Sequence, residues 1–277
     1  MSEALFVVED LTVTLPTSRG PVDVVKNVSF TVDRDDTVGI VGESGSGKSM
    51  TSLAVLGLLP PGARTTGSIR LDGQELLGRS EAELRSIRGN EISMVFQDPL
   101  SALNPYYTVG LQIEEGYRAH RGGSRREARR VAIEALERVH IPDPGRRIDH
   151  YPHQFSGGQR QRIMIAMALC CSPALLIADE PTTALDVTVQ AQILKLLAEL
   201  QRETGTGLIF ITHDLAVISS IARRVLVMCE GNAVEYGTAE QIFSDPQHEY
   251  TRALLDAVPR IDDLVPAVEA AAGEVPA

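Results

Sequence analysis

Cysteine is scarce in this chain of 277 residues, which contains only Cys170, Cys171 and Cys229. The three cysteines match no metal-ligand spacing and form no even set from which a disulfide framework could be built. Two of them are adjacent within an apolar, helix-like run. We therefore expect buried free thiols in a protein of a reducing compartment.

The chain also lacks an excess of positive charge. Its 26 Lys and Arg residues are outnumbered by 37 Asp and Glu residues, which gives a formal net charge of -11. A surface that follows a nucleic-acid backbone needs clustered Lys and Arg. We therefore expect no nucleic-acid partner. The one Arg cluster, Arg121 to Arg130, is interpreted as a solvated helix face with i,i+4 pairs to Glu127 and Glu134 rather than as a surface for anionic lipid.

Long apolar runs are absent as well. The longest, from Ile163 to Ala178, is interrupted by Ser172 and Pro173, and it is shorter than the roughly 20 residues that a membrane-spanning helix needs. The first ten residues are acidic and lack the leading positive charge of a signal peptide. We expect a chain that is soluble by itself and reaches a membrane only through a partner.

What the chain does contain is a phosphate-binding pattern, G-x-x-x-x-G-K-[ST], matched at every fixed position. The pattern consists of Gly42, Glu43, Ser44, Gly45, Ser46, Gly47, Lys48 and Ser49. It lies between a strand-like run, Thr37 to Val41, and a helix-like run, Met50 to Leu59. Its glycines allow backbone N–H groups to converge on phosphate oxygens, and the helix start adds positive potential. We predict that Lys48 contacts the β- and γ-phosphates of a nucleotide and that Ser49 binds Mg²⁺.

An acidic pair, Asp179 and Glu180, follows the apolar strand-like run from Ala174 to Ala178. Carboxylates at the C-terminal end of a buried parallel strand lie at the edge where α/β sheets bind ligands. We predict that Asp179 takes part in binding Mg²⁺ beside Ser49. Glu180 is the predicted general base for the water that attacks the γ-phosphate.

The order of periodic segments indicates an α/β fold. Short apolar alternation predicts strands at residues 4–15, 22–32 and 66–72, around the phosphate-binding pattern. Residues 98–155 show helical periodicity and no strong strand, whereas strand–helix alternation returns at Ala174. The sequence therefore predicts a parallel sheet covered by helices and interrupted by a mostly helical insertion.

A second anion site is predicted in the run Phe155, Ser156, Gly157, Gly158, Gln159. Ser156 is placed to cap a helix that continues to about Cys171, and the glycines leave its first N–H groups uncovered. With this run the chain resembles the ATP-binding-cassette ATPases, whose signature is usually Leu-Ser-Gly-Gly-Gln. The resemblance covers about residues 5–240, and Phe155 changes the shape of one apolar position.

This resemblance implies a RecA-like P-loop core with an N-terminal antiparallel β subdomain and an inserted helical subdomain. The ATPase domain would span residues 1–260, with the insertion at about 98–170, and residues 261–277 would form an acidic, mobile tail. In this family two cassettes form a head-to-tail dimer. Each ATP then lies between the phosphate loop of one chain and the signature of the other.

The other motifs of the family follow in order. Gln97 matches the glutamine that contacts Mg²⁺ and the attacking water, and His213 matches the switch histidine at the γ-phosphate. Ala184, Leu185 and Asp186 match the loop that crosses the dimer interface. One position departs from the pattern, because Leu15 stands where an aromatic normally stacks on adenine. The only nearby aromatics are Phe6 and Phe30, so apolar packing on the base is expected.

Three further segments resemble the ATPases of peptide and nickel importers. They are the run from Val95 to Pro105, the strand and turn from Gly67 to Gly73, and the run from His248 to Leu255, in which Glu249 replaces the usual Pro. The resemblance implies two membrane permease subunits, a second ATPase subunit, identical or different, and an extracytoplasmic solute-binding protein. It also implies a peripheral position on the cytoplasmic face of the membrane. The C-terminal part lacks the cysteines that hold an iron–sulfur cluster in some relatives, so no cluster is expected.

Three other functions fit these motifs less well than ATP-driven import. A non-transport cassette ATPase would usually carry two cassettes, long coiled coils or zinc cysteines. A plain P-loop kinase would lack the Ser-Gly-Gly-Gln signature, and an inactive regulatory cassette would not need both Glu180 and His213. The transported solute stays open among dipeptide, oligopeptide, nickel and other small solutes.

Overall fold

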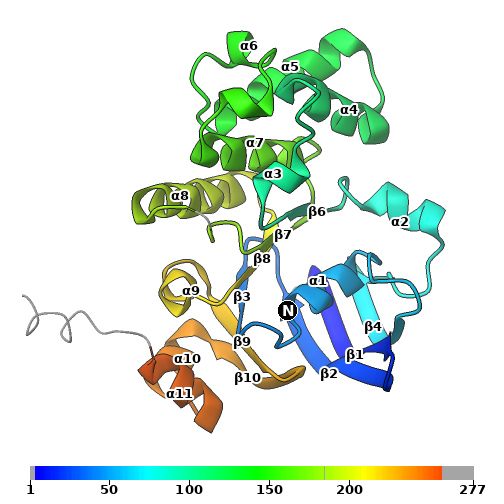
Figure 1. The fold of residues 1–277 in the computed structure, drawn as a ribbon, viewed down its shortest axis with the longest axis vertical. Coiled ribbons are helices and arrows are strands. Elements are labelled where there is room, and N and C mark those ends of the chain that lie inside the picture. The colour runs from blue at the N-terminus through cyan, green and yellow to red at the C-terminus, as the bar shows by residue number, and fades with distance from the viewer. Residues whose placement is uncertain (1–3, 184, 258–277) are drawn as a thin grey trace, which may run out of the picture.

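The computed structural model describes residues 4–183 and 185–257, and a ten-stranded sheet forms its centre (Figure 1). The strand order is β5-β4-β1-β2-β10-β9-β3-β8-β7-β6. The strands are β1 (Phe6–Thr17), β2 (Gly20–Val32), β3 (Thr37–Val41), β4 (Arg64–Leu71), β5 (Gln74–Glu75), β6 (Ile92–Val95), β7 (Leu175–Asp179), β8 (Gly207–Thr212), β9 (Arg224–Cys229) and β10 (Asn232–Thr238).

One end of the sheet is antiparallel. β1 pairs with β2 and β4, and β4 pairs with β5. Buried Phe6, Val8, Leu11 and Val13 lie along β1, and the register shifts between Val8 and Leu11. A bulge of this kind keeps Leu11 on the core face although the residue count from Val8 is odd. The N-terminal strands expected from apolar alternation are therefore present.

The other end of the sheet is mainly parallel. β3 lies between β8 and β9, and β7 lies between β8 and β6, with all four pairings parallel. Every residue of β3, β7 and β8 is buried. Strands buried on both faces read as continuous apolar runs, which is why these three were recognisable in the sequence. Parallel pairing brings their carboxyl ends to one edge of the sheet.

Helices follow or connect the strands. They are α1 (Lys48–Val55), α2 (Glu81–Ile87), α3 (Pro99–Ala102), α4 (Val109–Arg121), α5 (Arg125–Arg138), α6 (Pro144–Arg147), α7 (Gly157–Leu169), α8 (Val187–Thr204), α9 (Leu215–Ile221), α10 (Ala239–Ser244) and α11 (Glu249–Asp256), with a 3-10 helix at Pro152–Gln154. In the described part of the chain, no helix is both long and apolar enough to cross a membrane.

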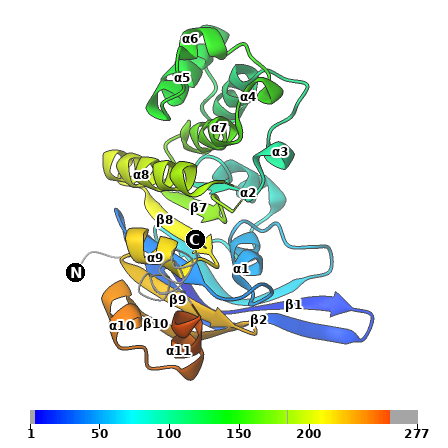
Figure 2. The same cartoon turned by 60° about the vertical axis from the view of Figure 1, so that its left-hand side comes forward.

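The helices α3 to α7 form a group that lies away from the antiparallel strands (Figures 1 and 2). Side-chain caps begin three of them, because Thr108, Ser124 and Ser156 each accept a backbone N–H from the first turn. Their apolar faces share one core with the parallel strands, in which Leu136 and Ile163 are fully buried. The helical group is therefore attached to the parallel part of the sheet.

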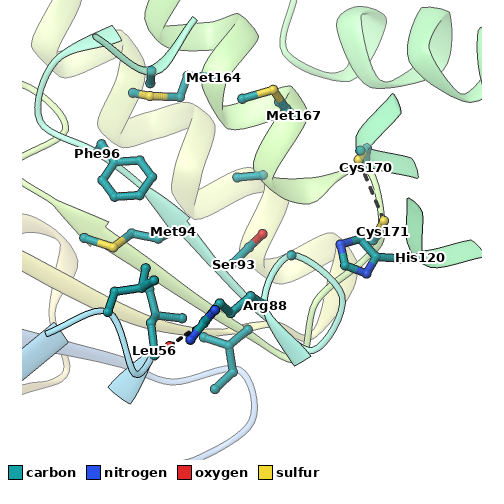
Figure 3. A pocket seen from close by; sticks show the side chains of 16 residues that line it. Leu56, Arg88, Ser93, Met94, Phe96, His120, Met164, Met167, Cys170 and Cys171 are labelled. Carbon is teal, nitrogen blue, oxygen red and sulfur yellow. Dashed lines mark hydrogen bonds between the residues drawn. The ribbon is translucent and has the colours of Figure 1, made fainter. Parts of the chain in front are cut away.

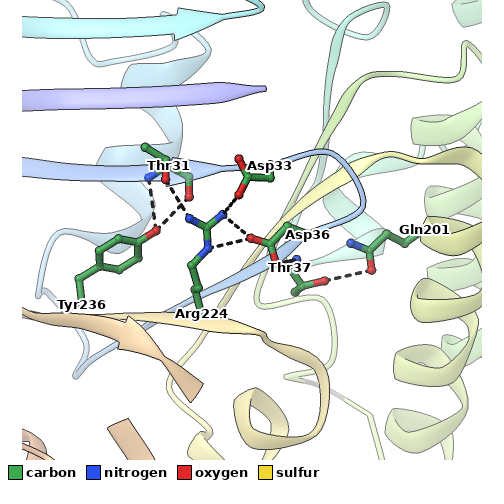
Figure 4. A network of polar contacts seen from close by, with 7 residues as sticks. All are labelled: Thr31, Asp33, Asp36, Thr37, Gln201, Arg224 and Tyr236. Carbon is green, nitrogen blue, oxygen red and sulfur yellow. Dashed lines mark hydrogen bonds and ion pairs between the residues drawn. The ribbon is translucent and has the colours of Figure 1, made fainter. Parts of the chain in front are cut away.

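A network around Arg224 joins β9 to the turn between β2 and β3 (Figure 4). The guanidinium donates twice to Oδ2 of Asp36, from Nε at 2.8 Å and from Nη2. Its Nη2 also donates to Oδ2 of Asp33 at 2.9 Å. The guanidinium donates as well to the hydroxyl of Thr31, whose backbone carbonyl accepts from Tyr236 at 3.0 Å. Because Thr31 and Tyr236 lie on β2 and β10, these contacts hold the two parts of the sheet together.

The structure adds elements that the periodicity did not predict, among them β10, α10 and α11. It also moves both ends of one helix, since α1 begins at Lys48 rather than at Met50 and ends at Val55 rather than at Leu59. The last residues of the phosphate-binding pattern already have helical backbone, which shifts the helix toward the pattern. Ala184 and the tail 261–277 lie outside the described residues.

Candidate nucleotide site

A cavity of about 840 Å³ opens at the carboxyl ends of the parallel strands. Its walls come from the phosphate loop, from residues that follow β6, β7 and β8, and from three apolar side chains. The lining residues are Val24, Gly42, Glu43, Ser44, Gly45, Gly47, Lys48, Ser49, Met50, Gln97, Glu180, Thr183, His213 and Leu254. The cavity thus brings together the three predicted catalytic residues and every residue of the phosphate-binding pattern except Ser46.

The loop between β3 and α1 depends on glycine at two positions. A Cβ at Gly42 would lie 2.1 Å from the carbonyl oxygen of Met228, and a Cβ at Gly47 would lie 2.7 Å from that of Val24. Gly47 also has φ 103°, which L side chains rarely adopt. The loop can therefore curl against β2 and β9 only because these residues lack side chains.

Lys48 lies inside this curl. Its Nζ donates to the carbonyl oxygens of Gly42 at 2.7 Å and Glu43 at 2.8 Å. Burial lowers the pKa of Lys48, while the nearby charges of Glu180 and Asp179 act in the opposite direction. An ammonium group held at the centre of a loop of backbone amides fits a polyphosphate.

Ser49 lines the cavity and contacts Asp179, which is buried behind it and is absent from the lining. The Ser49 hydroxyl donates to Oδ1 of Asp179 at 3.3 Å. Burial raises the pKa of Asp179, although the hydrogen bond from Ser49 opposes this effect. A hydroxyl beside a buried carboxylate provides the hard oxygen donors that Mg²⁺ prefers, and a bound cation would compensate the buried negative charge.

Glu180 is the centre of the polar contacts in the cavity. Its Oε2 accepts hydrogen bonds from Gln97 Nε2 at 3.1 Å and from Thr183 Oγ1 at 2.8 Å, and its Oε1 lies 3.2 Å from His213 Nδ1. Burial acts to raise the pKa of this carboxyl, but the hydrogen bonds from Thr183 and His213 outweigh it, so the pKa is lowered. Glu180 is therefore ionised at neutral pH.

The backbone of Glu180 adopts φ 47°, the left-handed region that is unusual for a residue with a side chain. Its N–H donates to the carbonyl oxygen of Ile211 at 2.8 Å, which continues the pairing of β7 with β8. Strained backbone of this kind persists where surrounding contacts fix it, and it is common at functional sites. Here it turns the carboxylate toward Gln97 and His213.

The predicted second anion site lies elsewhere. Ser156 Oγ accepts the Gln159 N–H at 3.3 Å, and Gln159 Oε1 accepts the Ser156 N–H at 3.2 Å, which forms a reciprocal cap at the start of α7. Ser156, Gly157, Gly158 and Gln159 are absent from the residues that line the cavity. Leu185 lies beside Gly157, and Asp186 caps α8 through the Val189 N–H.

Four residues of the cavity were missed in the sequence. Thr183 could have been found only from its closeness in the chain to Glu180, which it follows by three residues. Val24, Met50 and Leu254 gave no signal, because isolated apolar residues are usually part of a core. Phe6 and Phe30 are both buried and pack against each other with ring centroids 6.1 Å apart, so neither faces the cavity.

Comparisons with known proteins fit this geometry. Residues 25–183 match the ABC transporter family, and residues 234–277 match the C-terminal region of oligopeptide/dipeptide transporters. The chain belongs to the ABC transporter family of ATPases. Its first match contains the phosphate loop, Gln97, the signature and the acidic pair, and its second contains α10 and α11.

Two curated relatives are similar to this ABC ATPase over most of its length. The oligopeptide transport ATP-binding protein OppD of Salmonella typhimurium is 52% identical over 261 residues, which are 94% of this chain and 78% of the relative. The dipeptide transport ATP-binding protein DppD of Bacillus subtilis is 52% identical over 262 residues, with the same two shares. The sequence-based identification with the peptide-importer ATPases is confirmed.

Solved structures give the same fold. A dimeric ATP-binding cassette, MJ0796, in a post-hydrolysis state bound to ADP and Pi has a TM-score of 0.74 and 30% identity, covering 84% of this chain and 98% of that one. The cassette cbiO1 of Clostridium perfringens, from the complex cbiONQ, has a TM-score of 0.76 and 30% identity, covering 96% and 100%. The predicted RecA-like α/β fold is confirmed.

Proposed function

We propose that this ABC ATPase hydrolyses ATP to drive the import of peptides, or of a similar small solute, through partner permease subunits. The observation that carries the proposal is the convergence of Gln97, Thr183 and His213 on the Glu180 carboxylate at the open end of the phosphate loop. Such an arrangement positions a base for an attacking water. The names and the C-terminal family of its relatives support the peptide cargo.

The cavity residues divide between binding and chemistry. Residues 42–49 bind the phosphates, with Lys48 as the charged contact, and Ser49, Asp179 and Gln97 are the residues that would hold Mg²⁺. When bound, Mg²⁺ neutralises charge on the phosphates. Glu180 accepts a proton from water, and His213 both orients Glu180 and contacts the terminal phosphate. The 3.2 Å contact between these two side chains supports the pairing.

A second ATPase subunit, identical or different, would complete the site. Ser156 to Gln159 present an anion-binding helix start that does not reach the cavity of their own chain. A head-to-tail dimer would place this helix start over the phosphates held by the partner. The loop that contains Leu185 and Asp186 lies next to Gly157, which supports a role for that loop at the same interface.

A groove between the sheet and the helical group supports docking of a permease (Figure 3). It has a volume of about 290 Å³, and its walls include Leu56, Met94, Phe96, Met164 and Met167. Phe96 is 43% exposed and directly precedes Gln97. An apolar, methionine-rich groove suits an amphipathic helix. Movement of such a helix would be passed to Gln97 through Phe96. Docked in this way, the ATPase would lie peripherally on the cytoplasmic face of the membrane.

The proposal includes the domain division. Residues 1–260 would form the ATPase domain with a helical insertion at about 98–170, and residues 261–277 would form a separate tail. The position of α3 to α7 between β6 and β7 supports the insertion. An extracytoplasmic solute-binding protein would deliver the solute, and this chain would not contact it.

The test is ATP-driven uptake in proteoliposomes that contain this chain with its permease subunits and a peptide-loaded binding protein. We expect uptake and ATP hydrolysis with the unchanged chain. Glu180→Gln should still bind ATP but lose hydrolysis and uptake together, because the amide cannot accept the proton. Hydrolysis by Glu180→Gln near the original rate would reject the proposed base.

A further inference from the structure

The C-terminal helix α11 contacts the phosphate loop, although about two hundred residues separate them in the chain. The backbone N–H of Glu43 donates to the hydroxyl oxygen of Tyr250 at 3.2 Å. Leu254, one helical turn further along α11, lines the cavity. Glu43 lies within residues 25–183, which match the ABC transporter family, whereas Tyr250 and Leu254 lie within the C-terminal match, residues 234–277.

The position of α11 is fixed by polar contacts at its N-terminus. Glu235 on β10 accepts the backbone N–H groups of Gln247 at 2.8 Å and His248 at 3.1 Å. His248 Nδ1 then accepts the N–H of Tyr250 at 3.1 Å. These acceptors satisfy N–H groups that would have no partner at a helix start. These hydrogen bonds fix the N-terminus of α11 and therefore direct Tyr250 toward the phosphate loop.

Glu43 connects Tyr250 to Lys48. Its N–H is held by the Tyr250 hydroxyl, and its carbonyl oxygen accepts from Lys48 Nζ at 2.8 Å. The loop is held on another side by the turn between β9 and β10, where the Gly231 N–H donates to the Ser46 carbonyl oxygen at 3.1 Å. The outer part of the loop is thus attached to the C-terminal elements at two points.

The arrangement of elements indicates which part of a nucleotide α11 would face. In Figure 1, β6 and α11 lie on opposite sides of the region where β3 meets α1. Gln97 follows β6 and, with Glu180, belongs to the end of the cavity assigned to the terminal phosphate. Leu254 and Val24 bring only apolar surface to the cavity. The uncharged part of a nucleotide, its nucleoside, is the part that matches this wall.

We propose that α11 is part of the nucleotide site, with Tyr250 as a positioning residue for the phosphate loop and Leu254 as an apolar contact for the nucleoside. The proposal rests on the proposed function of residues 42–49 as the ATP-binding loop. It assigns to the C-terminal region of this chain, which contains α11, a direct influence on the affinity for nucleotide. By linkage, a bound nucleotide would in turn stabilise the docked position of α11.

The experiment measures the Kd of ATP and of ADP, with Mg²⁺, by calorimetry on the full chain. Tyr250→Phe removes only the hydroxyl, and loss of one such hydrogen bond should raise the Kd of both nucleotides by about three- to tenfold. The matched control is Tyr236→Phe, which removes a hydroxyl that hydrogen-bonds to Thr31 and should leave both Kd values unchanged. Thermal denaturation checks that the two variants lose similar stability.

Leu254→Ala and Leu255→Ala form the second matched pair, because both side chains pack on the core but only Leu254 lines the cavity. Leu254→Ala should raise the Kd of ATP and the Kd of ADP by the same factor, since both nucleotides contain the same nucleoside. Leu255→Ala should leave them unchanged. Equal Kd values within each pair would overturn the role of α11.

Lys48→Ala separates this inference from the proposal on which it rests. A weakened ATP affinity in Lys48→Ala together with unchanged affinity in Tyr250→Phe and Leu254→Ala would reject only the role of α11. Unchanged affinity in Lys48→Ala would reject the loop as the ATP site, and the inference about α11 with it.

Discussion

Oε1 of Glu180 lies 3.2 Å from Nδ1 of His213, although 32 residues separate them in the chain. The register of the sheet explains this contact. Asp179 on β7 is paired with Ile211 on β8, so the residues just beyond the two strand ends are neighbours. β6 pairs with β7 in the same direction, with Val95 opposite Ala178, which brings Gln97 to the other side of Glu180.

Removal of the Thr183 hydroxyl should slow hydrolysis and change its pH dependence. Hydrogen bonding from Thr183 lowers the pKa of Glu180, so Thr183→Val raises this pKa. As the proposed base, Glu180 would have to be ionised to accept a proton, and the acid limb of the kcat profile should therefore move to higher pH. At neutral pH we expect a loss in kcat of about three- to tenfold. Thr183→Ser should restore the original profile, and an unmoved acid limb in Thr183→Val would contradict the assignment.

Asp179→Asn should stabilise the chain in the absence of nucleotide. Burial raises the pKa of Asp179 above its value in the unfolded chain, so the ionised carboxylate reduces stability once the pH exceeds the unfolded pKa, about 3.9. Asparagine keeps an acceptor for Ser49 and removes the charge. Thermal denaturation should give a higher Tm for Asp179→Asn at neutral pH, with a difference that shrinks as the pH falls toward 4. A lower Tm at neutral pH would show that the charge is compensated in the unliganded chain.

Arg224→Ala should destabilise the whole sheet. Asp36 is 6% exposed, and without the guanidinium its carboxylate would be buried and uncompensated, which costs about 3–5 kcal/mol. The control is Arg34→Ala, whose ion pair with Asp72 joins side chains that are 59% and 49% exposed and contributes about 0–1 kcal/mol. Urea denaturation of both variants measures the difference. Equal losses would mean that the Arg224 network contributes no more than a surface pair.

Met167→Asp should weaken the association with permease subunits. Met167 lines the apolar groove between the sheet and the helical group, and a charge there opposes burial of an apolar partner surface. Val22→Asp is the control, because Val22 is a 47% exposed apolar residue on β2 that is absent from the groove. Co-purification with tagged permease subunits should fall for Met167→Asp and stay unchanged for Val22→Asp. Equal recovery of both variants would exclude the groove as the docking site.

Residues close together in the chain made much of the site predictable. The phosphate-binding pattern lies within eight residues between a strand and a helix, and the acidic pair ends a strand that is apolar throughout. These patterns are local, because backbone curl, helix start and strand burial each depend on neighbouring residue types. The surface helices of the C-terminal part were less visible, since short amphipathic segments give little periodicity.

The contacts of Thr183, Tyr250 and Leu254 illustrate what periodicity cannot provide. Tyr250 reaches the Glu43 N–H only because Glu235 and His248 orient the start of α11. No spacing in the chain specifies that such a helix packs beside a loop two hundred residues earlier. Likewise, Phe6 and Phe30 are the aromatic residues near Leu15 in the sequence, and only the structure shows that the core buries both rings.

The sequence by itself determined the class of chemistry. Glycines, a lysine and carboxylates at this local spacing are suited to binding a polyphosphate and to few other functions. It also determined the α/β fold through continuous apolar strands. Only the tertiary structure decided that Gln97, Thr183 and His213 meet at Glu180 and that α11 adjoins the phosphate loop. These are distances between separate elements, and they are set by strand register and by packing of the core rather than by neighbouring residues in the chain.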